Sequence, residues 1–253
     1  MMGLKFGKLP ARPGSISFKF KDFFNLDALP RPPAVYGHQL GTHWGMLAND
    51  QYGDCVWAGA AHEHMMWTRI GVAPDAAFTS PNVLADYSAV TGFNPAKPDS
   101  DQGTDMQEAA SYRRKVGIID KDGVRHKIDA YLGINPKNVS RLAIASYLFG
   151  AVGVGIQVPD SCEDQFDAGK PWTVVPDSQI VGGHYVPLVG RNRNGHFLVV
   201  TWGRLHAVTP DFLKTYADEA VMYLTTEMMN AKGLTMEGFD VASLKASLQK
   251  LEG

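Results

Sequence analysis

The sequence contains little cysteine and no strong excess of charge of either sign. Its two cysteines, Cys55 and Cys162, are too few for the disulfide framework of a small secreted scaffold. Lysine and arginine number 24 against 26 aspartates and glutamates, which gives a net charge of −2. Such a balance provides no general attraction for a polyanion. Neither nucleic acid nor a membrane is therefore expected as a partner.

Long apolar runs are missing as well. The N-terminus lacks the apolar core of a signal peptide, and no run approaches the length needed to span a bilayer. Together with the scarcity of cysteine, this predicts a protein that is made and folded in a reducing cytoplasm.

Cofactor motifs are also absent. There is no Walker A loop, no GxGxxG after a strand and no set of zinc ligands at the usual spacing. His62 and His64 flank Glu63, but positions i and i+2 of a helix point in different directions. We therefore expect no metal and no other cofactor.

What the chain does contain is enough apolar material for a sizeable core. Of its 253 residues, 45% are hydrophobic and 10% are aromatic. This composition excludes disorder throughout and suits one large domain, or one domain with appendages.

A turn followed by a helix places one cysteine at a helix start. Residues 49–54 read Asn-Asp-Gln-Tyr-Gly-Asp, and small and apolar residues follow from Cys55. Asp54 is a suitable N-cap, so a helix is predicted from Cys55 to about Ile70. The N–H groups and dipole at a helix start favour a thiolate over a thiol. The plainer alternative is a buried structural cysteine, as most lone cysteines are.

A glycine-rich apolar stretch far downstream contains a histidine. Residues 182–190 read Gly-Gly-His-Tyr-Val-Pro-Leu-Val-Gly, which includes His184, and residues 195–203 read Gly-His-Phe-Leu-Val-Val-Thr-Trp-Gly. Asn-Gly between them is a strong hairpin signal. A cysteine at a helix start with a histidine on a later strand is the order of a thiol hydrolase. Cys55 and His184 are thus the candidate nucleophile and base.

Together these stretches resemble the papain-like cysteine peptidases. Cys55 is followed by Trp57-Ala58, as in that family, and Gly183-His184 and Trp202-Gly203 match its later motifs. The resemblance covers about residues 44–225. It implies a peptidase or amidase that cleaves a peptide or isopeptide bond, with Trp202 covering the histidine. Acyl transfer to an amine is a further alternative that the sequence does not separate from hydrolysis.

The resemblance also assigns cleft and oxyanion positions, with two departures. Gly103 and Gly183 would line the substrate cleft. Val200 stands where the family has the asparagine that orients the histidine. The oxyanion glutamine has no clean match: Asn49 has the family spacing, and Gln51 lies two residues closer to the cysteine. If Val200 faces the imidazole, strand alternation turns its neighbour Thr201 away.

The expected fold class is α+β. A helical half over residues 41–120 would carry the cysteine helix, and an antiparallel sheet half over residues 121–225 would carry the histidine. Appendages would be an extended, basic, proline-containing arm over residues 1–40 and a C-terminal segment over residues 226–253.

Local patterns predict further elements within that domain. The expected helices are 81–90, a third one starting near 104 with a capping box from Thr104 to Gln107, 139–149 and 210–217. The expected strands are 128–132, 151–158, 185–190, 196–202 and 220–225, and residues 163–172 are expected to form a loop.

The arm and the C-terminal segment lie outside the catalytic resemblance. Alternation at Ile16, Phe18 and Phe20 predicts a short strand, and an apolar stripe over residues 240–251 predicts a docking helix. The arm is interpreted as an inhibitory pro-segment, as an arm that docks on another subunit, or as a strap lying over its own domain. The sequence favours the strap, since a papain-type pro-segment would be longer and helical.

A second function competes with the enzyme. The pattern around Cys55 and His184 also resembles papain-like proteins of tailed phages and prophages. That resemblance implies a structural or assembly subunit with little turnover, located in a virion, which would bind other subunits through residues 1–40 and 240–251.

Overall fold

A computed structural model describes residues 4–24, 29–37, 43–235, 237–238 and 240. Its α-helices are α1 (Phe20–Phe23), α2 (Cys55–Ile70), α3 (Ser80–Thr91), α4 (Met106–Lys115), α5 (Val139–Phe149), α6 (Ser161–Asp167) and α7 (Pro210–Tyr216). Short 3₁₀ turns are η1 (Pro98–Ser100) and η2 (Thr226–Met228).

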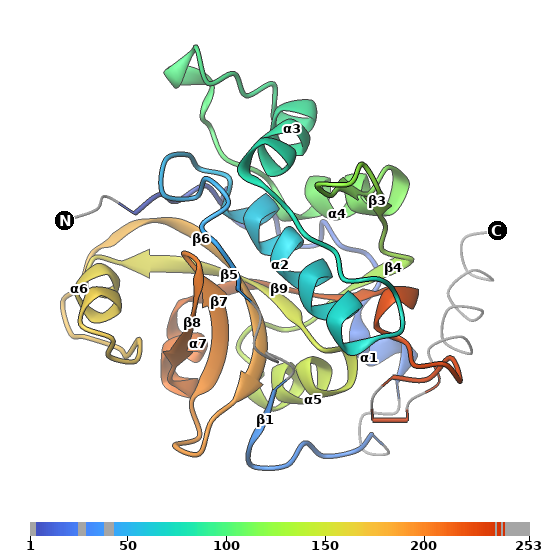
Figure 1. The fold of residues 1–253 in the computed structure, drawn as a ribbon. Helices are drawn as coiled ribbons and strands as arrows, with labels where there is room; N and C mark the ends of the chain where they lie inside the picture. Colours follow the sequence, from blue (N-terminus) through green and yellow to red (C-terminus); the bar gives the residue numbers. More distant parts are fainter. Residues whose placement is uncertain (1–3, 25–28, 38–42, 236, 239, 241–253) are drawn as a thin grey trace.

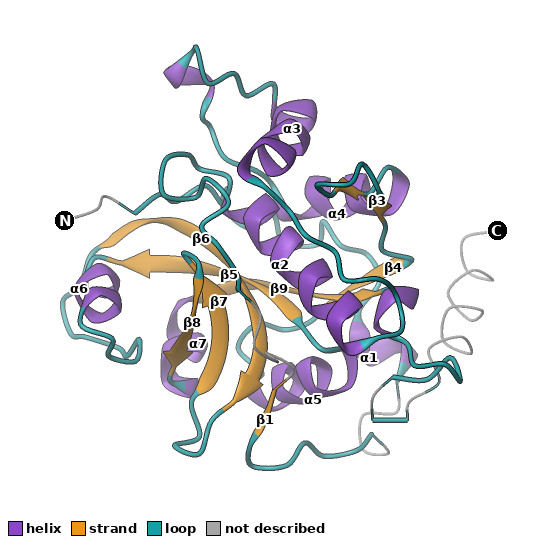
Figure 2. Ribbon diagram, viewed as in Figure 1, coloured by secondary structure: helices purple, strands orange, loops and turns teal. Residues whose placement is uncertain are grey.

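The strands form one large antiparallel sheet and one small one (Figure 2). They are β1 (Tyr36–Gly37), β2 (Ile118–Ile119), β3 (Arg125–His126), β4 (Ala130–Gly133), β5 (Val152–Pro159), β6 (Ile180–Arg191), β7 (Phe197–Thr201), β8 (Arg204–Val208) and β9 (Ala217–Leu224). The large sheet has the order β4-β9-β5-β6-β7-β8, with β1 added beside β6, and β2 pairs with β3. This mixture of helices and an antiparallel sheet confirms the expected α+β class.

Helix α2 is central because it lies directly against the sheet (Figure 1). Residues 58–61 of its first turns have small side chains or none. Gly59 permits the closest approach, because a Cβ at that position would stand 2.4 Å from the Tyr185 ring on β6. Farther along, Trp67 is fully buried and its indole N–H donates to the Phe149 carbonyl at the end of α5. Small residues near the start and bulky ones later therefore fit the helix to the sheet.

A buried polar network joins the helices to the sheet. Arg113 on α4 lies 2.7 Å from Glu63 on α2, and the side chains are 1% and 0% exposed. The Tyr185 hydroxyl on β6 donates to the same carboxylate at 2.6 Å, and the guanidinium lies over the Tyr223 ring on β9. Because a buried charge is strongly unfavourable without its partner, this network fixes the relative position of the elements that carry it.

Most predicted elements of the central domain are present. Helices α2, α3 and α5 and strands β5, β6 and β7 lie within a few residues of the predicted bounds. The structure differs from the prediction in other places. The expected loop at 163–172 begins with helix α6, in which Cys162 and Phe166 are buried, and strands β1, β2, β3 and β8 were not predicted.

Of the two predicted caps, that of α2 is at the predicted residue and that of α4 is not. Asp54 stands at the N-cap of α2, but its side chain makes no capping hydrogen bond. At α4 the cap is Asp105, whose carboxylate accepts from the N–H groups of Gln107 and Glu108, whereas Thr104 accepts from the Trp57 indole instead. The Asp105 carboxylate thus satisfies two of the free N–H groups of the first turn, and the Thr104 N–H donates to the Gly7 carbonyl instead.

The described part of the N-terminal arm lies over its own domain, as the strap interpretation predicts. The strand expected over residues 16–20 is not formed, since Phe20 begins α1 and only Lys19 makes an isolated bridge, to Gly133. Ile16 and Phe20 are buried, whereas Phe18 between them is only partly buried.

The predicted helix over residues 240–251 falls almost wholly outside the described residues. None of the described helices is long and apolar enough to cross a membrane.

Candidate active site

Cys55 and His184 line the same small cavity. Cys55 is the first residue of α2, and His184 lies on β6, where it pairs with Ile156 of β5. Both are 1% exposed, and the cavity has a volume of about 10 Å³. That is room for about one water molecule, and far too little for a peptide. No hydrogen bond joins the two side chains within the described residues.

The imidazole of His184 is positioned by two neighbouring side chains, those of Thr201 and Trp202. Its Nε2 lies 2.8 Å from the Thr201 hydroxyl, and the Trp202 ring stacks on it at a centroid distance of 4.5 Å and an angle of 18°. Its Nδ1 is buried and has no hydrogen-bond partner. One ring nitrogen is therefore oriented by the protein and the other is left for the cavity.

Thr201 occupies the orienting place that the sequence assigned to Val200. Val200 is buried and lines the cavity, but the polar contact with the ring comes from its neighbour. The count along the chain assumed a regular hairpin. In fact Leu188 pairs with Val199 whereas Gly190 pairs with Leu198, so β6 has one extra residue against β7. A one-residue bulge exchanges the faces of the residues beyond it.

Both groups of the pair are neutral in this structure. Burial raises the pKa of the Cys55 thiol to about 12, although the amides of Tyr185 and Gly7 oppose the shift. Burial lowers the pKa of His184 to about 3. The expectation of a thiolate favoured by the helix start is thus wrong for this state, because desolvation outweighs the helix dipole.

The N-terminal arm fills the cleft above the pair. The amides of Gly7 and Lys8 donate to the Gly183 carbonyl at 3.1 and 3.0 Å. On the other side, the Thr104 amide donates to Gly7 O at 2.7 Å, and the Leu9 amide donates to Thr104 O at 3.0 Å. The arm is therefore bound through its main chain from both walls, as an extended peptide is.

Glycines make this close contact possible. A Cβ on Gly103 would stand 2.3 Å from the Gly7 carbonyl oxygen, and one on Gly183 would stand 2.2 Å from that of Lys8. The two predicted cleft glycines, Gly103 and Gly183, thus both contact the arm. On the Gly103 side the hydrogen bonds come from Thr104 rather than from Gly103 itself.

The arm also covers the catalytic candidates directly. The Phe6 ring contacts the His184 and Trp202 rings edge-on, each at a centroid distance of 6.1 Å. The Gly7 amide faces the Cys55 thiol, whereas the Gly7 carbonyl oxygen is bonded to Thr104. The sulfur therefore meets an N–H group of the arm rather than an electrophilic carbonyl carbon.

The two oxyanion candidates lie in different places. Asn49 is 3% exposed and lines the cavity, with its amide donating to the Tyr52 carbonyl at 3.1 Å and facing the buried Asp54 carboxyl. Gln51 is exposed and does not line the cavity. Of the two, only Asn49 is placed to approach a reacting carbonyl.

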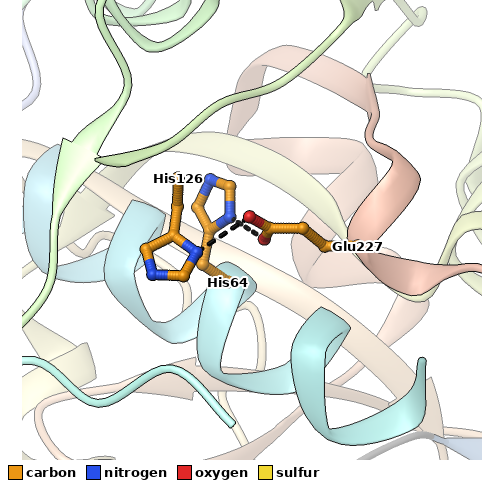
Figure 3. A group of neighbouring side chains, drawn as sticks. All are labelled: His64, His126 and Glu227. Carbon is orange, nitrogen blue, oxygen red and sulfur yellow. Dashed lines mark hydrogen bonds and ion pairs between the residues drawn. The ribbon is translucent and has the colours of Figure 1, made fainter. Parts of the chain in front are cut away.

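One group of side chains in the described residues has the composition of a metal site (Figure 3). Glu227 accepts from His64 Nδ1 at 2.6 Å and from His126 Nδ1 at 2.8 Å, and Asp120 lies 3.3 Å from His126 Nε2. His62 points elsewhere, to the Trp44 carbonyl, as its spacing from His64 predicts. Each imidazole bonds Glu227 through its Nδ1, whereas His64 Nε2 is buried without a hydrogen-bond partner among the described residues and His126 Nε2 is approached by Asp120 as an ion pair.

Sequence reasoning missed the residues that act at long range. Thr201 was expected to face away from the imidazole, Thr104 was assigned only to a helix cap, and Lys8 and Asp218 carry no motif. The ligand-type cluster joins positions 64, 126 and 227, whose separation hides it from any spacing rule. The local signal that could have pointed to the arm as the occupant of the cleft is the pair Gly7-Lys8, which lies against the cleft glycines Gly103 and Gly183.

No protein-family model and no curated protein sequence matches the chain. Several solved structures, however, are similar to it. Xylellain, a cysteine protease from Xylella fastidiosa, superposes with a TM-score of 0.65 at 13% identity, over 88% of this chain and 96% of that one. The chain has a papain-like fold.

Two further solved structures extend this similarity. Procathepsin L2 from Tenebrio molitor larval midgut gives a TM-score of 0.59 at 15% identity, over 86% of this chain and 74% of that one. ProCathepsin B S9 from Trypanosoma congolense gives 0.61 at 12% identity, with 87% of both chains covered. The resemblance to phage and prophage proteins gains no support from these structures and stays a prediction.

Proposed function

We propose that this chain is a latent thiol hydrolase that cleaves amide bonds in peptides or proteins. The observation that carries the proposal is the arrangement of His184. Thr201 and Trp202 contact its ring, its Nδ1 has no hydrogen-bond partner among the described residues, and His184 and Cys55 line the same cavity. A papain-like fold places a cysteine and a histidine in this relation for acyl transfer.

The reaction follows from these groups. His184 Nδ1 takes the thiol proton while the Cys55 sulfur attacks the substrate carbonyl carbon, which forms a tetrahedral intermediate. The Cys55 N–H, which has no partner within the helix because it belongs to its first turn, donates to the oxyanion. Asn49 supplies a second donor after its amide turns from Tyr52. The imidazolium then protonates the leaving amine, and water releases the acyl group from the sulfur.

Latency follows from the arm. With residues 6–9 in the cleft, the pair is desolvated and neutral, and no substrate fits. When the arm leaves, water and substrate reach the cavity, the thiol pKa falls, and a thiolate–imidazolium pair becomes accessible. Two of the similar solved structures are of pro-enzymes, which supports a covered cleft as a resting state.

Turnover of a protein substrate after release of the arm tests this function. Lys8→Glu places a carboxylate against Asp218, 2.9 Å from the present lysine nitrogen, and should expel the arm from the full chain. The variant should digest denatured casein, with fragments identified by mass spectrometry, whereas the wild type should be slow.

The controls are Cys55→Ala and His184→Ala in the Lys8→Glu chain, which should abolish digestion. An added amine, such as glycine methyl ester, would appear in the fragments if acyl transfer competes with hydrolysis. Absence of turnover from a folded variant whose Cys55 is accessible to alkylation would contradict the enzyme and leave the alternative function, an assembly subunit. The neutral pair and the filled cleft favour that alternative if the arm never leaves.

A further inference from the structure

Lys8 is buried in a way that lysine rarely is. Its side chain is 1% exposed, and its ammonium nitrogen lies 2.9 Å from Asp218 Oδ2 and 2.9 Å from the Leu9 carbonyl oxygen. Lysine is almost never fully buried without a partner, because the charge must be desolvated. A pocket that accepts this side chain is therefore shaped for it.

The pocket is formed by elements of the folded domain rather than by the arm. Gly155 on β5 leaves room for the methylenes: a Cβ there would stand 2.1 Å from Lys8 Cε, and 2.9 Å from the Met106 sulfur at the start of α4. Asp218 and Glu219, both on β9, supply negative charge at its end. Apolar walls with acid at the end are complementary to a long basic side chain.

The pocket also has an acceptor to spare. Asp218 Oδ1 is buried and has no hydrogen-bond partner among the residues that the structure describes, while its other oxygen binds Lys8. An arginine, whose planar fork can engage both carboxylate oxygens, would use the second oxygen as well. Positive charge on a long stem is thus the chemistry that the pocket recognises.

The backbone contacts beside the pocket do not select a side chain. Gly183 and Thr104 hold Gly7, Lys8 and Leu9 through main-chain atoms only. Bonds of this kind give affinity to any extended peptide, and side-chain pockets then give specificity. Gly7 adds a steric condition, since a Cβ on it would stand 1.7 Å from the Gly53 carbonyl oxygen.

The geometry points to a recognition site for extended peptides that carry glycine followed by a basic residue, in which the chain's own Gly7-Lys8 is bound as an internal ligand. The basic side chain enters the pocket between Gly155, Met106 and Asp218, and the glycine passes beside Cys55. In this pose Cys55 meets the Gly7 N–H and the Gly7 carbonyl is bonded to Thr104, so such peptides occupy the cleft as ligands that block it, and their binding can be measured whether or not the site turns over.

Binding in trans tests the inference. The probe is a fluorescein-labelled peptide of residues 4–12, followed by anisotropy, and the proteins are full chains that expel their own arm. Lys8→Glu expels it by charge, and Gly7→Val expels it by contact with Gly53 while the pocket stays intact. Both should bind the probe, whereas the wild type, whose cleft is filled, should bind at least tenfold more weakly.

Changes in the probe separate the contributions of the basic side chain and of the glycine to binding. Replacement of its Lys8 equivalent by norleucine should weaken binding at least tenfold, replacement by arginine should change it less than threefold, and Gly7→Ala in the probe should weaken it at least tenfold. In a protein that carries Gly7→Val, Asp218→Asn should remove most of the preference for lysine over norleucine.

Equal affinity for the lysine and norleucine probes would overturn the inference, as would absence of binding to both variants when each unfolds cooperatively. Lysine-selective binding without any turnover would leave the inference standing and overturn the proposed function. Turnover by a variant that binds the lysine and norleucine probes equally would do the reverse.

Discussion

His184 and His126 are both buried, yet the structure shifts their pKa values in opposite directions. The polar partner of His184 is the Thr201 hydroxyl, and burial lowers the pKa of the ring to about 3. The two ring nitrogens of His126 lie 2.8 and 3.3 Å from the Glu227 and Asp120 carboxylates, and these raise its pKa against the desolvation that lowers it.

Two carboxylate partners outweigh desolvation at His126, whereas one carboxylate does not at the more deeply buried His64, whose pKa is lowered to about 4. Carboxylates on both sides make the His126 cluster a charged structural link. A hydroxyl behind His184 orients the ring without fixing a charge on it, which leaves the proton affinity of the site to the solvent and to the arm. The arrangement around His184 suits a base that must accept a proton only when substrate is present.

The largest expected effect is on the buried polar network of Arg113, Glu63 and Tyr185. Arg113→Met leaves the buried Glu63 carboxylate without its partner, so the free energy of unfolding should fall by about 3–5 kcal/mol. Urea denaturation followed by circular dichroism measures it. The exposed Lys115→Met is the matched control and should change stability by less than about 0.5 kcal/mol. Equal effects from the two variants would show that the network does not carry the stability assigned to it.

Glu227→Gln should weaken the His126 cluster by a smaller amount. It replaces the shared carboxylate acceptor of His64 and His126 by an amide, and the loss should be about 1–3 kcal/mol, measured in the same way near pH 5.5.

The loss should depend on pH in both directions. The folded pKa of Glu227 is about 2, below the ordinary 4.5, so its contribution is present above pH 4.5 and is lost as the pH falls toward 2. The folded pKa of His126 is raised above 6.5, so its contribution is present below pH 6.5 and is lost as the pH rises through the folded value. The difference between wild type and variant should therefore be greatest between pH 4.5 and 6.5. A difference that does not vary with pH would contradict the ion-pair assignment.

Thr201→Val tests the other histidine and should have a modest effect. Loss of one buried neutral hydrogen bond, worth about 0.5–1.5 kcal/mol, should slow casein digestion by the Lys8→Glu chain about two- to tenfold. Thr201→Ser keeps the hydroxyl and should restore the rate. If Thr201→Val and Thr201→Ser behave alike, Thr201 does not position His184.

Local and periodic features of the sequence were sufficient for most of the fold. The cysteine helix was predicted at 55–70 because small and apolar residues follow a turn, and α5 at 139–149 because its apolar residues keep a helical spacing. Strand β6 and its hairpin followed from β-branched residues and an Asn-Gly turn. These signals lie within one element and need no partner.

The site was predicted less well because its contacts join distant segments. One bulge near Val189 was enough to exchange Val200 and Thr201 at the imidazole. The thiol pKa was misjudged because the helix start is visible in sequence whereas the cover provided by Phe6 and Gly7 is not. The strap interpretation placed the arm over its own domain, but only the structure shows that it enters the cleft.

Alkylation of Cys55 by iodoacetamide, mapped by mass spectrometry between pH 6 and 8, tests most directly whether the arm keeps the site latent. The buried Cys162 serves as the internal reference for general unfolding. In the wild type both cysteines should stay unmodified, and in Lys8→Glu Cys55 alone should react, already at pH 6. Reaction of Cys55 at the same rate in both chains would contradict the account.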